Sequence, residues 1–392
     1  MKNKNLQFLE RELDEIKEKN LYRTLRLLKG EQQPVVIIDD REVILLCSNN
    51  YLGLSSHPKL KAAAKEAIDK YGCSASSSRL ISGNMGLHEK LEGKIANFKK
   101  TEDSLLFNSG YTANVGVIPT LIGKGDVIFS DELNHASIID GCRMSRAEIR
   151  VFPHKDMDFL EKLLSESSKF KRKLIITDGV FSMDGDLAPL PEIVKLADKY
   201  SSAIMVDDAH ATGILGRGGR GIVEHYGLDG KVEIIMGTLG KALGSFGAYI
   251  AGNKILKEYL INKCRSFIFT TALPPPVLAS SFAAIELIEG EPQIREKLWS
   301  NVKYLRKELT QLGYSIGGET QIIPIIIGDE GLTMTLGERL LDEGVFVQGI
   351  RYPTVPRGKA RLRITVSSAH SMDNLEKALD AFDKVGHELK II

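Results

Sequence analysis

A lysine in a glycine-rich stretch is the residue of this chain with the most distinctive chemistry. Lys241 lies in GTLGKALG (237–244), directly after the apolar run EIIMGT (233–238). A lysine fixed at the end of a strand can form a Schiff base with an aldehyde, particularly where burial lowers its pKa. An ordinary surface lysine is the alternative, and this motif alone does not exclude it.

Acidic residues end a second apolar run. In AIMVDDAH (203–210), Asp207 and Asp208 stand where a strand should end, and His210 follows. Polar residues at the carboxyl edge of a parallel sheet face the usual ligand crevice. A buried aspartate there needs a cationic or hydrogen-bonding partner, and a protonated pyridine nitrogen would serve. Taken alone, the motif fits a turn-capping carboxylate as well.

Two further segments place polar groups where helices should begin. In LLFNSGYTANVGVI (105–118), Gly110 and Tyr111 follow a strand, and free N–H groups at a helix start bind phosphate where glycine allows close approach. In SDELNHASIIDG (130–141), His135 could stack on a flat cofactor ring or act as an acid or base. Each segment by itself also fits a simple helix cap or a structural histidine.

The elements that must position these residues alternate along the chain. Helices such as 156–168 and 191–200 separate short β-branched runs, which lie at 104–107, 127–131, 149–153, 173–179, 203–208, 233–238 and 247–252. Apolar strands joined by crossovers predict an α/β domain with a mostly parallel sheet. The four polar groups then lie at successive strand ends of one sheet. Together they supply the contacts that pyridoxal phosphate requires.

The rest of the chain predicts elements on either side of this sheet. The N-terminal part predicts a helix over 6–28, a hairpin of strands 35–39 and 42–48, and a helix over 57–72. The C-terminal part predicts helices over 277–289, 292–312, 332–343 and 371–386, and strands over 321–327, 345–350 and 360–366. We therefore expect an N-terminal helix and hairpin segment (1–47), a large α/β domain (48–276) and a smaller C-terminal α+β domain (277–392).

Composition excludes several classes of function. Lys and Arg (52) nearly balance Asp and Glu (51), which argues against a nucleic-acid partner. The first twenty residues are charged throughout and lack the apolar core of a signal peptide, and no apolar run reaches the ~18 residues that span a bilayer. We expect a cytoplasmic protein without a membrane partner. The four cysteines and eight histidines show no metal-ligand spacing, so we expect reduced thiols and no metal.

A nicotinamide dehydrogenase is a competing hypothesis, because residues 216–221 (GRGGRG) formally fit GxGxxG. This run does not directly follow a strand, and no acidic residue ends a second strand about 20 residues later. GTLGKA resembles a phosphate-binding Walker loop but is too short, and GxSxG is absent. We therefore do not favour a dinucleotide site here.

The whole set of motifs resembles the α-oxoamine synthases, which are fold-type I pyridoxal-phosphate enzymes. The resemblance covers nearly the whole chain and rests on SNNYLGLSSHP (48–58), SRLISG (78–83), FNSGYTAN (107–114), NHASIIDG (134–141), DGVFSMDGDLAPL (178–190), VDDAHATG (206–213), GTLGKALG (237–244), FTTALPP (269–275) and IRYPTVPRGKARLRIT (350–365).

The resemblance implies a role for each matching residue. For the cofactor, Lys241 would bind its aldehyde and act as the base, Asp207 would hold the ring nitrogen, and His135 would stack on the ring. Further cofactor contacts would come from Gly110, Tyr111, Ser182, His210, Thr238 and, in a homodimer with shared active sites, from Thr270 and Thr271 of the neighbouring subunit. Asn49 and Arg363 match positions that hold the amino-acid carboxylate. Arg23 and Thr354 match positions assigned to the acyl substrate, and His135 also faces the substrate.

The resemblance further implies a reaction. Members that join L-alanine to a pimeloyl thioester with loss of carbon dioxide, in biotin synthesis, are the most similar. Members that use glycine and acetyl-CoA are the alternative, and some relatives use both pairs. A non-catalytic scaffold with the same fold is a remote hypothesis, since a scaffold needs none of Lys241, Asp207, His135 and Arg363.

Two positions depart from the family pattern. Residues 73–78 (CSASSS) carry serines where glycines are usual, and serine tolerates a positive φ less well. Tyr352 stands where proline is often found, two residues before Thr354. Both departures concern the acyl substrate rather than the cofactor.

Overall fold

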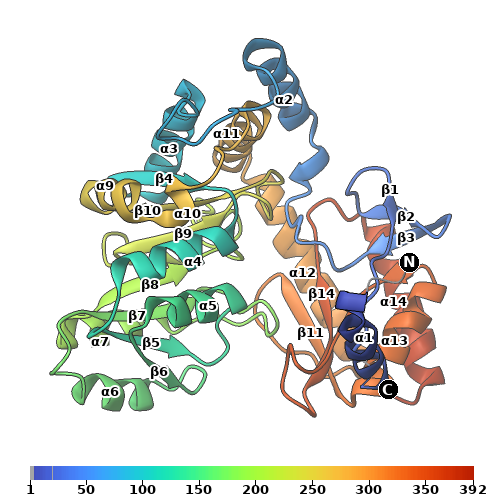
Figure 1. The fold of residues 1–392 in the computed structure, drawn as a ribbon. Coiled ribbons are helices and arrows are strands. Elements are labelled where there is room, and N and C mark those ends of the chain that lie inside the picture. The colour runs from blue at the N-terminus through green and yellow to red at the C-terminus, as the bar shows by residue number, and fades with distance from the viewer. Residues whose placement is uncertain (1–3, 20) are drawn as a thin grey trace.

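The computed structural model describes residues 4–19 and 21–392, and in this part of the chain the strands form three sheets (Figure 1). The largest sheet has the order β4-β10-β9-β8-β7-β5-β6. Its strands are β4 (Asp103–Phe107), β5 (Val127–Asp131), β6 (Glu148–Phe152), β7 (Lys173–Asp178), β8 (Ala203–Asp207), β9 (Ile234–Thr238) and β10 (Ala248–Gly252). In this sheet β10 alone runs opposite to the other six strands, so the predicted α/β fold with a mostly parallel sheet is confirmed.

The central strands are apolar because helices cover the sheet. Every residue of β5 and β9 is buried, whereas β6 at the edge is mostly exposed. The covering helices of this part are α3 (Gly86–Lys99), α4 (Gly110–Leu121), α5 (Ala136–Ser145), α6 (Met157–Ser165), α7 (Leu190–Tyr200), α8 (Ile222–His225), α9 (Lys254–Lys263) and α10 (Arg265–Ile268). Strands that are apolar on both faces are the expected result of this burial.

A second group of helices and strands lies beside the large sheet (Figure 1). The helices are α12 (Gln293–Gln311), α13 (Glu330–Asp342) and α14 (Met372–Glu388), whereas α11 (Pro275–Gly290) packs on α3. A sheet of order β11-β14-β13 consists of β11 (Ile322–Gly328), β13 (Gln348–Ile350) and β14 (Ala360–Thr365). This arrangement agrees with the α+β character expected after residue 276.

The N-terminal hairpin joins a third sheet, of order β1-β2-β3-β12. Its strands are β1 (Leu28–Lys29), β2 (Val35–Ile38), β3 (Arg41–Leu45) and β12 (Val345–Phe346), and β12 runs parallel to β3. The predicted strand 345–350 is therefore two strands, because β12 pairs with β3 while β13 pairs with β14. The predicted domain limits at 47 and 276 stay a prediction.

The predicted helix over 6–28 is wrong in its second half. After the short 3-10 helix η1 (Lys4–Leu6), helix α1 spans only Phe8–Glu18, and residues 21–27 are not helical. The N–H of Leu21 bonds to the carbonyl of Ile16, five residues earlier, which closes the helix. None of the α1 side chains is buried. Because a helix is stabilised mostly by packing of its apolar face, the apolar spacing alone did not extend this helix.

The segment between the hairpin and the large sheet matches the prediction closely. It contains the 3-10 helix η2 (Leu54–Ser56) and helix α2 (Pro58–Tyr71), with Pro58 at its first position and Gly72 at its end. α2 packs on α11. Among the described residues, none of the helices combines the length and hydrophobicity needed to cross a bilayer.

Candidate active site

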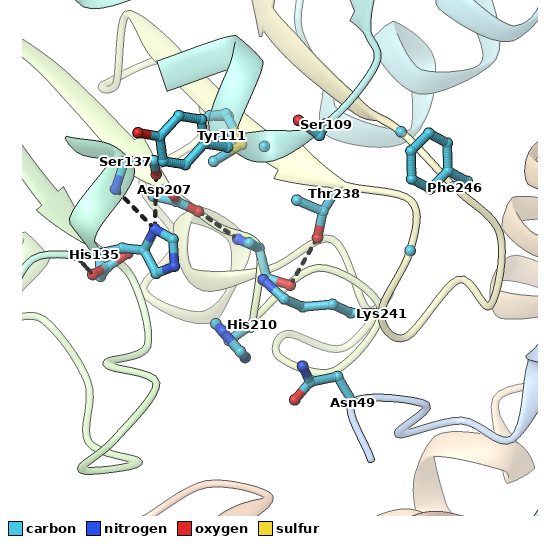
Figure 2. Close-up of a pocket in the computed structure, with 16 residues that line it drawn as sticks. Asn49, Ser109, Tyr111, His135, Ser137, Asp207, His210, Thr238, Lys241 and Phe246 are labelled. Carbon is cyan, nitrogen blue, oxygen red and sulfur yellow. Dashed lines mark hydrogen bonds between the residues drawn. The ribbon is translucent and has the colours of Figure 1, made fainter. Parts of the chain in front are cut away.

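Four parallel strands end at one edge of the large sheet with polar residues. Asp131, Asp178, Asp207 and Thr238 are the last residues of β5, β7, β8 and β9. A cavity of about 320 Å³ lies at this edge (Figure 2). It is lined by Asn49, Ser109, Gly110, Tyr111, His135, Ser137, Asp178, Asp207, Ala209, His210, Met236, Thr238, Gly240, Lys241, Phe246 and Gly247. Carboxyl ends of parallel strands are where α/β folds bind ligands.

Asp207 is a buried carboxylate, only 4% exposed, that faces this cavity. The side-chain amide of Asn114 donates to its Oδ2 at 2.9 Å, and the N–H of Ala209 donates to its Oδ1 at 3.0 Å. Within the described residues Asp207 forms no ion pair at 4 Å or less. A buried carboxylate in this position is suited to a cationic N–H donor of a ligand.

Lys241 reaches the same cavity from the turn after β9. The turn is tight: the N–H of Leu239 bonds to the carbonyl of Gly247, and the N–H of Gly244 bonds to the carbonyl of Lys241. Gly244 has a φ of 62°, and a Cβ there would lie 2.4 Å from the backbone nitrogen of Ser55. Figure 2 shows the Lys241 side chain extending into the cavity, with Thr238 and His210 on either side of it.

The surroundings of Lys241 favour its neutral amine. Burial lowers the pKa of Lys241, while the carboxylates of Asp207 and Asp178 oppose this effect and the guanidinium of Arg363 adds to it. A neutral amine is the form that attacks an aldehyde, so the predicted chemistry of Lys241 fits its environment.

The start of α4 forms a narrow cradle beside Thr238. Ser109 caps the helix, and its hydroxyl accepts the N–H of Thr112 at 3.1 Å. A Cβ on Gly110 would lie 2.8 Å from Cγ2 of Thr238, so only glycine leaves this space open. Free N–H groups at a helix start beside such a space suit a phosphate.

His135 lies at the start of α5, on the other side of the cavity. Its Nδ1 is 2.7 Å from the hydroxyl of Ser137, and its backbone N–H donates to Oδ2 of Asp178 at 2.7 Å. Loss of hydration lowers the pKa of His135, although Asp207 acts in the opposite direction. The imidazole is thereby held in one place and favours its uncharged form.

Asp178 is a site residue that the sequence reasoning missed. It is 4% exposed, lines the cavity, and stands opposite Asp207 in the register of β7 and β8. Burial raises the pKa of Asp178 well above its usual range, and the charge of Asp207 raises it further. The signal was available, because Asp178 ends the apolar run 173–179 just as Asp207 ends 203–208.

A second chain of contacts connects the cavity to β14. Nη2 of Arg363 donates to Oδ1 of Asn49 at 3.2 Å and lies 3.4 Å from the hydroxyl of Tyr51. That hydroxyl lies 2.7 Å from Nδ1 of His210. Nε of Arg363 donates to the carbonyl of Ser182. Burial first, and then the nearby basic groups of Lys241 and Arg363, lower the pKa of His210 well below its usual value.

Of the predicted site residues, eight line the cavity: Asn49, Gly110, Tyr111, His135, Asp207, His210, Thr238 and Lys241. Arg363 lies one contact away from the cavity, through Asn49, and Ser182 lies two contacts away, through Arg363. Thr270 and Thr271 are not lining residues; they accept hydrogen bonds from the Asn108 amide, just before the cradle. The structure thus gathers most of the set, while their individual roles stay predictions.

Arg23 and Thr354 line a separate groove of about 680 Å³. Residues 21–28 form one wall of it, and residues 346–354 form the other, including Tyr352. The two residues are therefore brought together, although 331 positions separate them in the chain. Arg357 lies 4.5 Å above the ring of Tyr352. The groove combines apolar side chains with arginines, which suits an acyl group.

The glycine-rich run 216–221 is not a phosphate cradle. The N–H groups of Gly218 and Arg220 donate to the carboxylate of Glu224 at 3.0 and 2.9 Å. A Cβ on Gly216 would lie 2.3 Å from the same carboxylate. Because an internal acid occupies the loop, a dinucleotide has no place there. Among the described residues, no group of three or more His, Cys, Asp or Glu side chains could hold a metal ion.

Comparison with known proteins agrees with this geometry. Residues 41–382 match the model of the family described as "Aminotransferase class I and II". The chain is 53% identical to the 8-amino-7-oxononanoate synthase of Thermoanaerobacter pseudethanolicus, over 99% of both chains. It is 47% identical to 8-amino-7-oxononanoate synthase 1 of Bacillus subtilis, over 99% of this chain and 100% of that one.

Solved structures give the same result. The serine palmitoyltransferase of Sphingomonas wittichii superposes with a TM-score of 0.94 at 34% identity, over 100% of both chains. The 8-amino-7-oxononanoate synthase of Francisella tularensis superposes with a TM-score of 0.77 at 30% identity, over 89% of this chain and 99% of that one. A serine palmitoyltransferase determined with pyridoxal phosphate as an internal aldimine has a TM-score of 0.94 at 33% identity, over 99% of both chains.

Proposed function

Because the chain belongs to the aminotransferase class I and II family and, within it, to the α-oxoamine synthases, we propose that it is a pyridoxal-phosphate enzyme that condenses L-alanine with a pimeloyl thioester. The products are 8-amino-7-oxononanoate, carbon dioxide and the free thiol, and the reaction belongs to biotin biosynthesis. The names of relatives at 47–53% identity favour this substrate pair over glycine and acetyl-CoA. A cytoplasmic location is part of the same proposal.

The observation that carries the proposal is that Lys241, Asp207 and His135 line one cavity beside an open cradle at Gly110. These residues fit pyridoxal phosphate group by group. Lys241 would bind the aldehyde, Asp207 would hold the ring nitrogen, and His135 would cover the ring. The start of α4 and Thr238 would hold the phosphate, and Ser182 and His210 would face the ring hydroxyl. When bound, the cofactor supplies an electron-withdrawing ring that takes up the electron pair released at the amino-acid Cα.

The protein's own groups then handle the proton and the carboxylate. Arg363 would bind the alanine carboxylate with help from Asn49, because a guanidinium fork matches a carboxylate. The Lys241 amine would remove the Cα proton and later return one. Burial lowers the pKa of Lys241, which makes more of the neutral amine available as a base than in a solvent-exposed lysine. The uncharged His210 would hold a hydrogen bond without adding a positive charge next to Lys241.

The groove that contains Arg23 and Thr354 would receive the acyl substrate. A pimeloyl group has an apolar chain with a carboxylate at its far end. The groove offers apolar side chains for the chain and arginines for the carboxylate, and it also contains Glu338, which pairs with Arg26. Formation of the bond from Cα to the thioester carbonyl expels the thiol, and loss of carbon dioxide from Cα completes the condensation. An assay of the purified protein with pimeloyl-coenzyme A and with pimeloyl carrier protein identifies which thioester it uses.

We further propose a homodimer with shared active sites. Large apolar side chains that are exposed in the single chain support it: Ile81 (82% exposed), Phe269 (71%) and Phe246 (55%). The N–H of Ala272 bonds to the carbonyl of Ser77, which connects the segment before Ala272 to the loop containing Ile81. Thr270 and Thr271 in this segment would reach the phosphate site of the neighbouring subunit.

Mixing two inactive variants tests the shared site. Hybrid dimers of Lys241→Ala and the double variant Thr270→Ala/Thr271→Ala contain one site with all native residues if the threonines act across the interface. Recovered activity on mixing supports the proposal, and its complete absence in verified hybrids contradicts it.

The substrate pair is tested with purified protein and pyridoxal phosphate. L-alanine with pimeloyl thioester is compared with glycine and acetyl-CoA, and the product mass is measured. Turnover of the first pair, with an absorbance that borohydride discharges, supports the proposal. Preference for glycine and acetyl-CoA overturns the substrate assignment. A protein without that absorbance overturns the enzyme assignment in favour of a scaffold.

A further inference from the structure

The loop of residues 180–187 connects the large sheet with the sheet that contains β14. An isolated bridge between Val180 and Leu187 closes the loop. On its β14 side, Arg363 donates to the carbonyl of Ser182, and Arg361 donates to the carbonyl of Met183 at 3.3 Å. Arg361 and Arg363 are two residues apart on one strand, so they point toward the same face. The loop therefore supplies one of the contacts that hold the Arg363 guanidinium, beside those from Asn49 and Tyr51.

His154 contacts the loop as well, in addition to Glu319 and Thr320, whose backbone N–H groups bond to the carbonyl of Gly185. Nδ1 of His154 lies 3.0 Å from Oδ1 of Asp131, and Nε2 lies 2.9 Å from Oδ2 of Asp186. The ring also meets the Phe181 ring edge to face, with centroids 4.4 Å apart. Asp131 ends β5, four residues before His135, whereas Asp186 lies in the loop. The imidazole thus bridges the strand end that leads to His135 and the loop that contains Ser182.

The charges around His154 keep it protonated. Burial would lower the pKa of His154, but hydrogen bonds to Asp131 and Asp186 dominate and raise it to about 9. Lys155 donates to Asp186 at 3.1 Å, and Glu132 accepts the backbone N–H of His154 at 2.9 Å. Among the described residues, Asp131 and Asp186 bond to the ring itself, Glu132 bonds to the backbone of His154, and Lys155 pairs with Asp186. A doubly paired imidazolium is a stronger tether than a neutral hydrogen bond.

We propose that His154 is a positioning residue for the amino-acid substrate: clamped between Asp131 and Asp186, it fixes loop 180–187 so that the carbonyl of Ser182 holds the Arg363 guanidinium at the cavity. The inference rests on the proposed function, because it takes Arg363 as the group that binds the alanine carboxylate. His154 itself does not line the cavity, so it acts only through the loop.

The test compares His154→Gln with two further variants. His154→Gln leaves the Asp186 carboxylate without its imidazolium partner. The double variant His154→Gln/Asp186→Asn removes that carboxylate as well. His387→Gln is the matched control, because His387 lies 3.9 Å from Asp383 in an exposed pair on α14. Each is assayed for amide hydrogen exchange in loop 180–187 without cofactor, for L-alanine binding by the absorbance of the loaded protein, and for KM and kcat.

For His154→Gln we expect faster exchange in loop 180–187, a dissociation constant and KM for L-alanine raised about tenfold, and kcat changed less than threefold. The double variant should recover most of the affinity, and His387→Gln should match wild type. Should His154→Gln fail to fold, Asp186→Asn alone, which leaves His154 paired with Asp131, must raise KM in the same direction.

Unchanged exchange in the loop together with an unchanged KM overturns the clamp. If wild type does not bind L-alanine at all, the proposed function is wrong, and exchange in cofactor-free protein alone decides the clamp: faster exchange supports it and unchanged exchange overturns it.

Thermal unfolding gives an independent check. Because the pKa of His154 is raised in the folded state, protonated His154 stabilises the fold. This stabilisation is complete below the unfolded-state pKa near 6.5 and is lost as the pH rises through about 9. The gap in Tm between wild type and His154→Gln should shrink over that range.

Discussion

Asp178 and Asp207 stand opposite each other at the ends of β7 and β8, two buried carboxylates in one cavity. Asp207 receives N–H donors from Asn114 and Ala209, whereas the side chain of Asp178 accepts, among the described residues, only the backbone N–H of His135. Two carboxylates in one buried site do not both ionise readily. The structure therefore divides the pair: Asp207, with an N–H donor on each oxygen, is suited to a ring nitrogen, and the raised pKa of Asp178 favours its protonated form.

Asp178→Asn tests this division. A carboxyl group with a raised folded-state pKa takes up a proton on folding, so its contribution to stability falls as pH rises from its unfolded pKa near 4 toward the folded value. We expect cofactor-free Asp178→Asn to have a higher Tm than wild type at pH 7, with the difference vanishing near pH 4. Its affinity for pyridoxal phosphate should stay within about threefold of wild type, because the amide oxygen still accepts the His135 N–H.

Asp178→Leu is the matched control for the hydrogen bond. It removes the acceptor as well as the proton, so we expect weaker cofactor binding than in Asp178→Asn. A Tm for Asp178→Asn that is lower than wild type at pH 7 would mean that Asp178 is ionised and that the division of the pair is wrong.

Asp207→Asn tests the electron-sink role of the neighbouring carboxylate. Loss of a charge-assisted hydrogen bond to the ring nitrogen leaves the released electron pair poorly stabilised, and a bond of about 3 kcal/mol corresponds to about a hundredfold in kcat. We expect kcat to fall by at least that factor, with retained but weaker cofactor binding measured by titration. A kcat within twofold of wild type would remove Asp207 from the mechanism.

The sequence predicts residues at strand ends well and residues that cross between elements poorly. Lys241, Asp207 and His135 each follow an apolar run, and parallel strands bring such positions to one edge. Asn114 lies inside α4, yet its amide reaches Asp207, 93 residues away. No local pattern marks a helical asparagine for that contact. The partners of His154 were missed for the same reason, because Asp131 ends a strand and Asp186 lies in a loop 55 residues further along the chain.

The errors in the fold have a related cause. The apolar spacing over residues 6–28 predicts one helix, but spacing does not show whether a face will be buried, and no α1 side chain is. The run 345–350 predicts one strand, yet β12 and β13 pair with strands of different sheets. Periodicity thus identifies an element, while its length and partners depend on packing that only the folded chain contains.

The buried Lys99–Asp208 pair predicts a large loss of stability on mutation. Lys99 Nζ lies 2.6 Å from Oδ2 of Asp208, and the two side chains are 1% and 0% exposed. Asp208 also accepts the hydroxyl of Thr212 at 2.7 Å. Lys99→Met leaves that carboxylate buried without its cation, which costs about 3–5 kcal/mol. We expect urea unfolding to measure a loss of that size.

Lys99→Met/Asp208→Asn is the control for the Lys99 prediction, because it removes both charges. Its loss should be clearly smaller than that of the single variant. A single-variant loss below about 1 kcal/mol would show that Asp208 finds another partner or a proton.

The pKa of Lys241 predicts how fast the protein captures its cofactor at different pH values. Burial lowers this pKa below its ordinary 10.5, so the neutral amine becomes abundant at lower pH than in free lysine. We expect the rate of covalent capture of pyridoxal phosphate by cofactor-free protein, followed by absorbance, to reach half its plateau below pH 10.5. Asp207→Asn removes a stabilising negative charge and should move this midpoint lower still. Arg363→Met removes a repelling cation and should move it higher. Shifts of the opposite sign, or a midpoint at 10.5 in wild type, would mean that Lys241 is hydrated and does not sense the cavity.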